Sequence, residues 1–133
     1  MGDLLSLRQL QLPIKLIVLN NSALAFVELE MKAADFPDFG ADLRNPNLAE
    51  LAGAAGLLGI RAETPDQVRP AIEQALQHDG PALVEAIVSR QELSMPPTIT
   101  LEQIKGFTLF TLKVVLSGRG DEIVDLAKTN LFR

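Results

Sequence analysis

Three short apolar runs, separated by segments with helix signals, constrain the fold of this chain more than any other feature. They cover residues 14–19, 59–63 and 82–88, and the first and last are almost continuously apolar. Runs of this kind indicate strands buried on both faces, as in a parallel sheet. Their alternation with helices and short loops predicts an α/β layer structure with a mostly parallel sheet.

Helix signals fill the segments around these runs. Asn45-Pro46 and Thr64-Pro65 each combine an N-cap residue with proline at the first helical position. Thr100 and Gln103 have the spacing of a capping box. Helices are therefore predicted over residues 2–11, 24–32 and 45–57, from 64 to the turn at 79–81, over 100–116 and over 121–132.

The character of the chain changes after Arg90, where Met95-Pro96-Pro97 favours an extended hinge. We assign the layered part to residues 1–91 and a helical tail to residues 92–133. Three strands make a thin sheet for this architecture. The leucine-rich segment at residues 4–12 also resembles the middle of a helix, because no capping residue precedes it. Both features suggest that a part of the protein is missing upstream.

Composition restricts the chemistry. The chain has 133 residues, the usual size of one domain, with 17 acidic against 12 basic residues and a net charge of −5. Nucleic acid is therefore not expected as a partner. The absence of Cys excludes disulfides, thiolate zinc sites and cysteine nucleophiles, and a single His leaves few groups for acid–base catalysis. With no spanning segment and no signal peptide, we expect a soluble, cytoplasmic protein.

The polar sequence Asn20-Asn21-Ser22 follows the first apolar run directly. Ligands of open α/β sheets bind outside the carboxyl ends of the strands, where amide and carbonyl oxygens suit Mg²⁺. The local pattern alone favours a simpler interpretation, in which these residues only cap a helix. Since Mg²⁺ normally takes at least one carboxylate and none lies close in sequence, either the site is absent or its acid comes from elsewhere.

The chain resembles the pyrophosphate-binding domain of thiamine-diphosphate enzymes. Residues 1–27 include a strand that ends in Asn20-Asn21, similar to the second half of a family motif made of Gly-Asp-Gly, a long spacer and Asn-Asn. Other segments are similar to the C-terminus of the pyruvate:quinone oxidoreductases (pyruvate oxidases), namely 79–85, 96–97, 105–107, 117–122 and 126–130. The resemblance implies a truncated three-layer parallel-sheet domain followed by a helical tail.

The resemblance also assigns roles to residues. It implies that the Asn21 side chain is a Mg²⁺ ligand, with the Ala23 carbonyl as a second. Phe26 falls where the family places an aromatic residue near the reacting cofactors, so it is the candidate catalytic residue. The residues expected along the diphosphate and the active-site rim are Asn21, Ser22, Ala23, Leu24, Ala25, Phe26 and Val27.

Two departures from the family pattern stand out. Position 25 is Ala where the relatives usually carry Gly, which predicts a tighter or shifted turn, because Gly tolerates backbone angles that Ala does not. The Gly-Asp-Gly sequence is absent, and the family's spacer would place its Asp just upstream of Met1. We therefore expect the C-terminal fragment of a larger enzyme, inactive alone.

The resemblance implies a complete enzyme that converts pyruvate to acetate and CO₂ and passes electrons to membrane quinone. Its cofactors would be thiamine diphosphate, Mg²⁺ and FAD, the last held by a part absent here. The partners expected are the rest of the enzyme chain and further copies of it, since a sheet that lacks a strand exposes an edge that favours association.

The last segment resembles a tail that binds membrane lipid at the inner face of the cell membrane. The residues expected to contact lipid are Ile123, Val124, Ala127, Leu131 and Phe132. Without the resemblance, the same stripe favours a helix packed on its own domain. The acidic residues beside it would make contact with anionic lipid weak and conditional. An alternative function is a non-catalytic α/β module that binds lipid or a partner chain through its C-terminal helices.

Two other features suggest structural roles. His78 lies at a predicted helix end beside Asp79, where an imidazole helps to cap the helix. Glu28 and Glu30 face opposite sides of a predicted helix, so they are not expected to act as a paired acid and base.

Overall fold

The computed structural model describes residues 2–36, 39–90, 101–118, 120–121, 123–124 and 128, with the side chains of 101–104 and 107 excepted. The chain forms two compact units. The first joins Met1–Asn21 to Arg44–Val88, and the second joins Ser22–Leu43 to Ser89–Arg133. The parallel sheet belongs entirely to the first unit.

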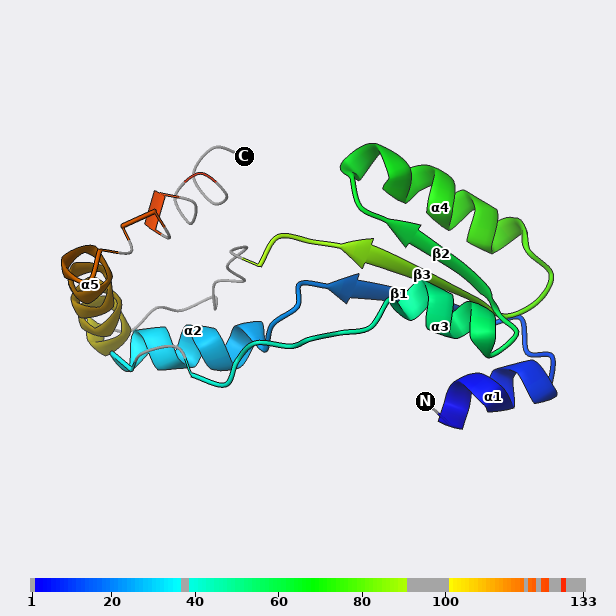
Figure 1. Ribbon diagram of the computed structural model, residues 1–133, viewed down its shortest axis with the longest axis horizontal. Helices are drawn as coiled ribbons and strands as arrows, with labels where there is room; N and C mark the ends of the chain where they lie inside the picture. Colours follow the sequence, from blue (N-terminus) through cyan, green and yellow to red (C-terminus); the bar gives the residue numbers. More distant parts are fainter. Residues whose placement is uncertain are drawn as a thin grey trace. The chain divides into compact units, whose positions relative to one another are not determined.

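Three parallel strands form the sheet, in the order β1-β3-β2. They are β1 (Lys15–Asn20), β2 (Leu58–Ala62) and β3 (Ala82–Ile87). The first and last residues of each strand lie within one residue of the predicted bounds. All three arrows point the same way in Figure 1. The last strand in sequence is therefore the central one, and the predicted α/β fold class is confirmed.

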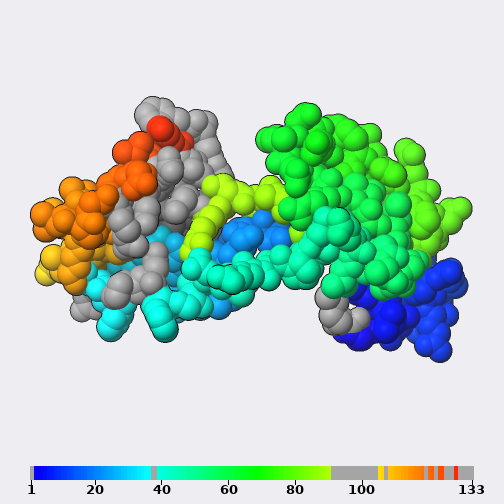
Figure 2. Space-filling model, in the orientation of Figure 1, coloured from blue at the N-terminus to red at the C-terminus, as the bar shows by residue number. Residues whose placement is uncertain are grey.

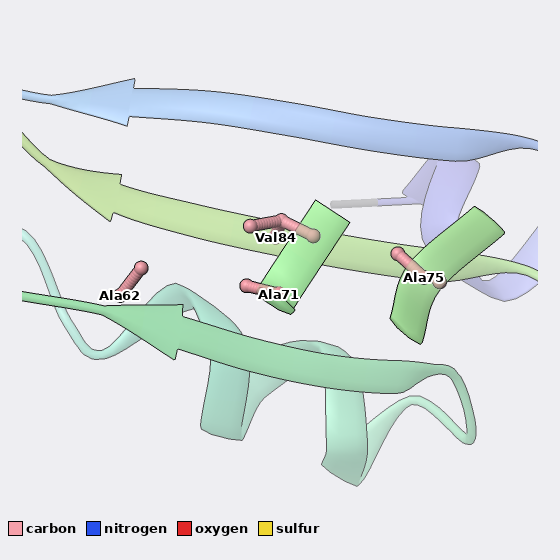
Figure 3. Packing of buried hydrophobic residues seen from close by; sticks show 5 residues of the cluster. Ala62, Ala71, Ala75 and Val84 are labelled. Atoms are coloured by element: carbon pink, nitrogen blue, oxygen red, sulfur yellow. The ribbon is translucent and has the colours of Figure 1, made fainter. Parts of the chain in front are cut away.

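Helix α4 (Pro65–Gln77) covers one face of the sheet (Figure 1). Thr64 is its N-cap, as predicted, and the Gln67 side chain accepts hydrogen bonds from the backbone N–H groups of Glu63 and Thr64, at 2.8 and 3.3 Å. The helix approaches the strands closely because its buried side chains are small. The cluster at this contact consists of Ala62, Ala71, Ala75, Ala82 and Val84 (Figure 3).

The opposite face is covered by α1 (Gly2–Gln9) and α3 (Leu48–Ala54), which complete a three-layer arrangement. In Figure 2 the dark-blue atoms of α1 lie against green atoms of the same unit. Gly59 allows the close approach of α3 to β2, since a Cβ there would lie 1.9 Å from the Ala49 carbonyl oxygen. The buried residues of this face are Ala52, Leu57 and Leu83, with Leu4, Leu7, Leu16 and Val18 packed against them.

The predicted start of the third helix is wrong by two residues. Asn47, not Asn45, is the N-cap of α3, and its side-chain oxygen accepts a hydrogen bond from the Glu50 backbone N–H at 3.0 Å. Asn45 instead uses its amide to contact Asn20 on β1. The Asn45-Pro46 pair therefore precedes the helix, because a longer-range contact engages the side chain that was expected to cap it.

The second unit contains α2 (Ala25–Ala33) and α5 (Leu101–Leu116), close to the predicted helices. The two helices approach closely at Gly106, where a Cβ would lie 1.7 Å from the Ala33 carbonyl oxygen. Phe110 and Val114 of α5 are buried. In the described part of the chain, no helix is long and apolar enough to cross a membrane.

Several predictions for the C-terminal part lie outside the described residues. They include the division between residues 91 and 92, the Met95-Pro96-Pro97 hinge, and three of the five lipid-contacting residues, Ala127, Leu131 and Phe132. Ile123 and Val124 are described and helical, and Val124 is exposed. These predictions remain predictions.

Candidate functional site

The carboxyl end of β1 has the polar turn that the sequence predicts. Asn20 is the last residue of the strand and is 7% exposed, and its carbonyl oxygen accepts a hydrogen bond from the Val88 backbone N–H at 3.1 Å. Asn21 follows and is half-buried. Ser22 adopts φ +54°, in the left-handed region, so the chain turns sharply as soon as the strand ends.

A buried carboxylate, Glu85, lies beside this turn. It belongs to the central strand β3, is 0% exposed, and faces the α3 side of the sheet together with Leu83. Its Oε1 accepts a hydrogen bond from the Asn20 side-chain amide at 2.6 Å. Its Oε2 accepts bonds from Arg61 Nη1 at 2.8 Å and from the backbone N–H groups of Leu48 and Ala49 at 3.0 and 3.4 Å.

These contacts determine the charge of Glu85. Burial on its own would raise the pKa of this carboxyl, because it disfavours the charged form. Hydrogen bonds from Asn20, Arg61 and the Ala49 backbone, with the charge of Arg61, outweigh burial and lower the pKa of Glu85 below its ordinary value. The group is therefore an anion at neutral pH, placed where the N-terminus of α3 favours negative charge.

Asn45 completes this network from the other side of Asn20. Its side-chain N–H donates to the Asn20 side-chain oxygen at 2.8 Å. Asn20 thus donates to Glu85 through its nitrogen and accepts from Asn45 through its oxygen. We define Glu85, Asn20 and Asn45 as the asparagine clamp. It fixes the amide of the residue directly before Asn21.

Sequence reasoning did not identify the clamp. The one available signal was Glu85 itself, a single carboxylate within an otherwise apolar strand. Such a group is almost never fully buried unless it is paired. Its partners lie 24 to 65 residues away in sequence, so no local pattern connects them.

The other predicted site residues, Ser22 to Val27, belong to the second unit, whereas Asn21 belongs to the first. Ala23 is buried and forms an antiparallel bridge with Asp42. On either side of it, the Leu24 backbone N–H donates to the Ala41 carbonyl at 2.8 Å, and the Leu43 N–H donates to the Ser22 carbonyl at 2.9 Å. The segment that leads into α2 is therefore held by its own backbone pairing.

The start of α2 exposes apolar side chains. Leu24, Phe26 and Val27 are exposed, and Phe26 reaches 71%. Ala25 is the first residue of the helix and is not among the residues with positive φ. The left-handed residue in this segment is Ser22, so alanine at position 25 fits the backbone that the structure gives it.

A second charged network, also missed from the sequence, stabilises this unit. The Glu28 carboxylate is 2.5 Å from Lys32 Nζ and 3.3 Å from an Arg90 nitrogen, and Arg90 also binds Asp42. Glu28 and Lys32 are both buried, and Lys32 Nζ lies 5.4 Å from the centre of the Phe110 ring. The hydrogen bond with Asp42 is the largest cause that raises the pKa of Arg90.

This network accounts for part of the charge pattern on α2. Glu28 is buried and Glu30 is exposed, so they face different sides of the helix as predicted.

His78 is the C-cap of α4, where its carbonyl accepts a hydrogen bond from Lys15 Nζ at 2.5 Å. Neither Glu28 nor His78 belongs to the polar turn.

The predicted Mg²⁺ ligands, the Asn21 amide oxygen and the Ala23 carbonyl oxygen, are neutral oxygen donors of the type that a hard cation prefers. By its chemistry this donor set fits Mg²⁺, and Asn21 directly follows β1. Among the residues that the structure describes, no three His, Cys, Asp or Glu side chains gather as a metal site.

The chain matches one protein family and several individual proteins. The family described as thiamine pyrophosphate enzyme, C-terminal TPP binding domain, matches residues 1–86. YdaP of Bacillus subtilis, named as a thiamine pyrophosphate-containing protein, is 31% identical over 129 residues, 97% of this chain and 22% of its own length.

Two acetolactate synthases are also similar. The mitochondrial enzyme of Schizosaccharomyces pombe is 27% identical over 95 residues, and the chloroplastic acetolactate synthase 3 of Brassica napus is 30% identical over 103 residues. Each match covers 71% of this chain, and 14% and 16% of the respective relative. This chain thus spans about a fifth or less of the relatives it matches. By its family match and its parallel sheet, the chain belongs to the thiamine pyrophosphate enzymes, as their C-terminal TPP-binding domain.

Proposed function

We propose that this chain supplies one side of the diphosphate- and Mg²⁺-binding site of a thiamine-diphosphate enzyme. The observation that carries the proposal is the polar turn at the end of β1, where Ser22 takes a left-handed φ and Asn20 is held on both sides. In this proposal the Asn21 amide oxygen and the Ala23 carbonyl oxygen hold the metal. Residues 21–27 line the diphosphate.

The Asn21 amide oxygen and the Ala23 carbonyl oxygen would hold Mg²⁺, which would supply positive charge to offset the negative charge of the diphosphate. This chain's own contribution is orientation. Asn21 offers a neutral oxygen, and the backbone N–H groups at the start of α2 offer donors to an anion. The exposed ring of Phe26 lies on the first turn of α2, and we assign it to contact with the bound cofactor.

Isothermal titration of the chain with thiamine diphosphate, with and without Mg²⁺, tests this proposal. We expect binding that requires Mg²⁺ and that Asn21→Ala abolishes. Asn47→Ala is the matched control, because Asn47 bonds within α3 and is expected to leave binding unchanged. Absence of binding by the unmodified chain at millimolar cofactor, or equal binding by Asn21→Ala, would overturn the proposal.

We further propose that the whole enzyme oxidises pyruvate to acetate and CO₂, with FAD as second cofactor and membrane quinone as electron acceptor. The support is the similarity of segments 79–85, 105–107 and 117–122 to pyruvate oxidases. Enzyme isolated from its source with an antibody against this chain should reduce a dye in the presence of pyruvate and form acetate. Acetolactate as the product would contradict this assignment. The chain alone, supplied with all three cofactors, should give no turnover.

We propose two partners beyond the cofactors. Strand β1 has a strand neighbour on one side only within the described sheet, and Ile17 and Leu19 on it are exposed. This edge suits a further strand, from the rest of the enzyme chain or from another copy. Analytical ultracentrifugation of the chain should therefore show self-association, and a strict monomer at high concentration would exclude the second source.

We assign the second partner, membrane lipid, to the C-terminal tail, at the inner face of the cell membrane. Exposed apolar residues on α5 support this assignment: Leu109, Leu112, Val115 and Leu116. Flotation with liposomes should recover the chain. Lipid binding without Mg²⁺-dependent cofactor binding would instead favour the alternative function, a non-catalytic module.

A further inference from the structure

We propose that Asn45 and Glu85 are positioning residues, which hold the Asn20 amide between them and thereby orient Asn21 for the cation. The inference deepens the proposed function and depends on it only for the identity of the ligand. The residues that carry it all belong to the first unit.

The first step is the placement of Glu85. In the sheet register, Glu85 lies beside Val18 on β1 and beside Arg61 on β2. Neighbours in register point to the same face, so Arg61 Nη1 reaches Glu85 Oε2 across the sheet at 2.8 Å. Asn20, two residues beyond Val18 on the same face, reaches Oε1 at 2.6 Å. One carboxylate therefore connects both outer strands.

The second step is the helix that Glu85 also holds. Its Oε2 accepts from the Leu48 and Ala49 N–H groups at the start of α3, at 3.0 and 3.4 Å. This contact fixes the loop before α3, which carries Asn45. The distance from Asn45 Nδ2 to Asn20 Oδ1 is 2.8 Å. The Glu85 carboxylate thus holds Asn20 in two ways. It accepts a hydrogen bond from Asn20 directly, and it fixes the loop whose Asn45 also binds Asn20.

The third step is the effect on Asn21. Three atoms of Asn20 are held: its side-chain nitrogen by Glu85, its side-chain oxygen by Asn45 and its carbonyl oxygen by the Val88 N–H. With Asn20 fixed, the direction of the Asn21 side chain depends on only a few torsions of that residue. Partners that orient a metal ligand in this way commonly affect metal affinity about ten- to a hundredfold.

Asn45→Ala and Asn47→Ala test the inference as a matched pair. Both remove an asparagine amide from the same loop, but Asn45 contacts Asn20 whereas Asn47 contacts Glu50 of its own helix. For each variant we would measure the Mg²⁺ concentration that half-saturates thiamine diphosphate binding. We would also record the backbone amide resonances of Asn21 and Ser22 without ligand.

We expect Asn45→Ala to raise the half-saturating Mg²⁺ concentration about tenfold and to shift both resonances. Asn47→Ala should lower the melting temperature and leave the Mg²⁺ requirement and both resonances unchanged. Glu85→Gln, which removes the charge at constant shape, should act like Asn45→Ala if it folds. If Glu85→Gln does not fold, the comparison of Asn45→Ala with Asn47→Ala still tests the positioning role.

The inference is overturned if Asn45→Ala leaves both the resonances and the Mg²⁺ requirement as they are in the unmodified chain. It is also overturned if Asn47→Ala changes them equally. If the unmodified chain binds no thiamine diphosphate, the proposed function fails. The resonances of Asn21 and Ser22 in the ligand-free variants then decide on the positioning role by themselves.

Discussion

The Asn20 side chain donates a hydrogen bond to Glu85 Oε1 across 2.6 Å, although 65 residues separate the two in sequence. This bond joins the end of the first strand to the middle of the last, and the last strand is the centre of the sheet. A residue next to the candidate metal ligand is thereby held by the most buried charge that the structure describes in the first unit.

The first prediction concerns pH. The pKa of Glu85 is lower in the folded protein than in the unfolded chain, because hydrogen bonds from Asn20, Arg61 and the Ala49 backbone outweigh burial. Its ionisation therefore stabilises the fold above the unfolded-state value, and this stabilisation is lost as the pH falls through the folded-state pKa. Between about pH 5 and pH 3, the free energy of unfolding should fall more steeply for the unmodified chain than for Glu85→Gln. Urea unfolding followed by circular dichroism measures this, and parallel curves would refute it.

The second prediction concerns the buried ion pair of the second unit. Lys32→Met removes one of the two ion-pair partners described for the Glu28 carboxylate. Glu28 remains buried and keeps its ion pair with Arg90. Loss of one partner from a buried pair costs about 3 kcal/mol. The double variant Glu28→Leu with Lys32→Met should cost less than the sum of the two single changes. Additive losses in a double-mutant cycle would show that the two side chains do not interact.

The third prediction concerns the contact between α2 and α5. Gly106→Ala would place a Cβ 1.7 Å from the Ala33 carbonyl oxygen, so the two helices must separate, and we expect a loss of about 2 kcal/mol or more. Gly53→Ala is the control, since nothing beyond its chain neighbours and its own helix backbone lies within 4 Å of a Cβ at that position. The control should gain about 0.5–1 kcal/mol from its better helix propensity. Equal effects of the two variants in thermal unfolding would contradict the close approach.

The fourth prediction separates binding from folding at Phe26. Its ring is exposed, so Phe26→Ala should change the free energy of unfolding by less than about 0.5 kcal/mol. The affinity for thiamine diphosphate should nevertheless fall. Phe39→Ala removes an even more exposed ring outside the candidate site and should change neither quantity. A drop in affinity for both variants, or for neither, would remove Phe26 from the site.

The strands and most helix boundaries could be predicted because their signals are local. The run 14–19 is apolar enough to indicate a buried strand, and Thr64 caps α4 as its position before Pro65 suggests. The strand order has no such signal, since it depends on which apolar faces the helices cover. Asn45 shows how a local signal fails: its capping pattern is genuine, but the contact with Asn20 engages its side chain.

The candidate site was predictable only in part, for the same reason. The polar turn after β1 is visible in the sequence, and the resemblance to a family assigns roles within it. Glu28 and Lys32 look like ordinary surface charges in sequence, because a charge becomes a buried one only through partners that the fold supplies. Glu85 stands out as a carboxylate within an apolar run, but the sequence does not show which residues pair with it. Arg90, 62 residues from Glu28, is one such partner.

The measurement that tests the central claim most directly is nuclear magnetic resonance of the chain with thiamine diphosphate and Mn²⁺ in place of Mg²⁺. A paramagnetic ion broadens the resonances of the residues that hold it. The account predicts selective broadening at Asn21 and Ala23, weaker effects along Ser22 to Val27, and loss of the effect in Asn21→Ala. Broadening that is absent, or centred on acidic surface residues away from the end of β1, would contradict it.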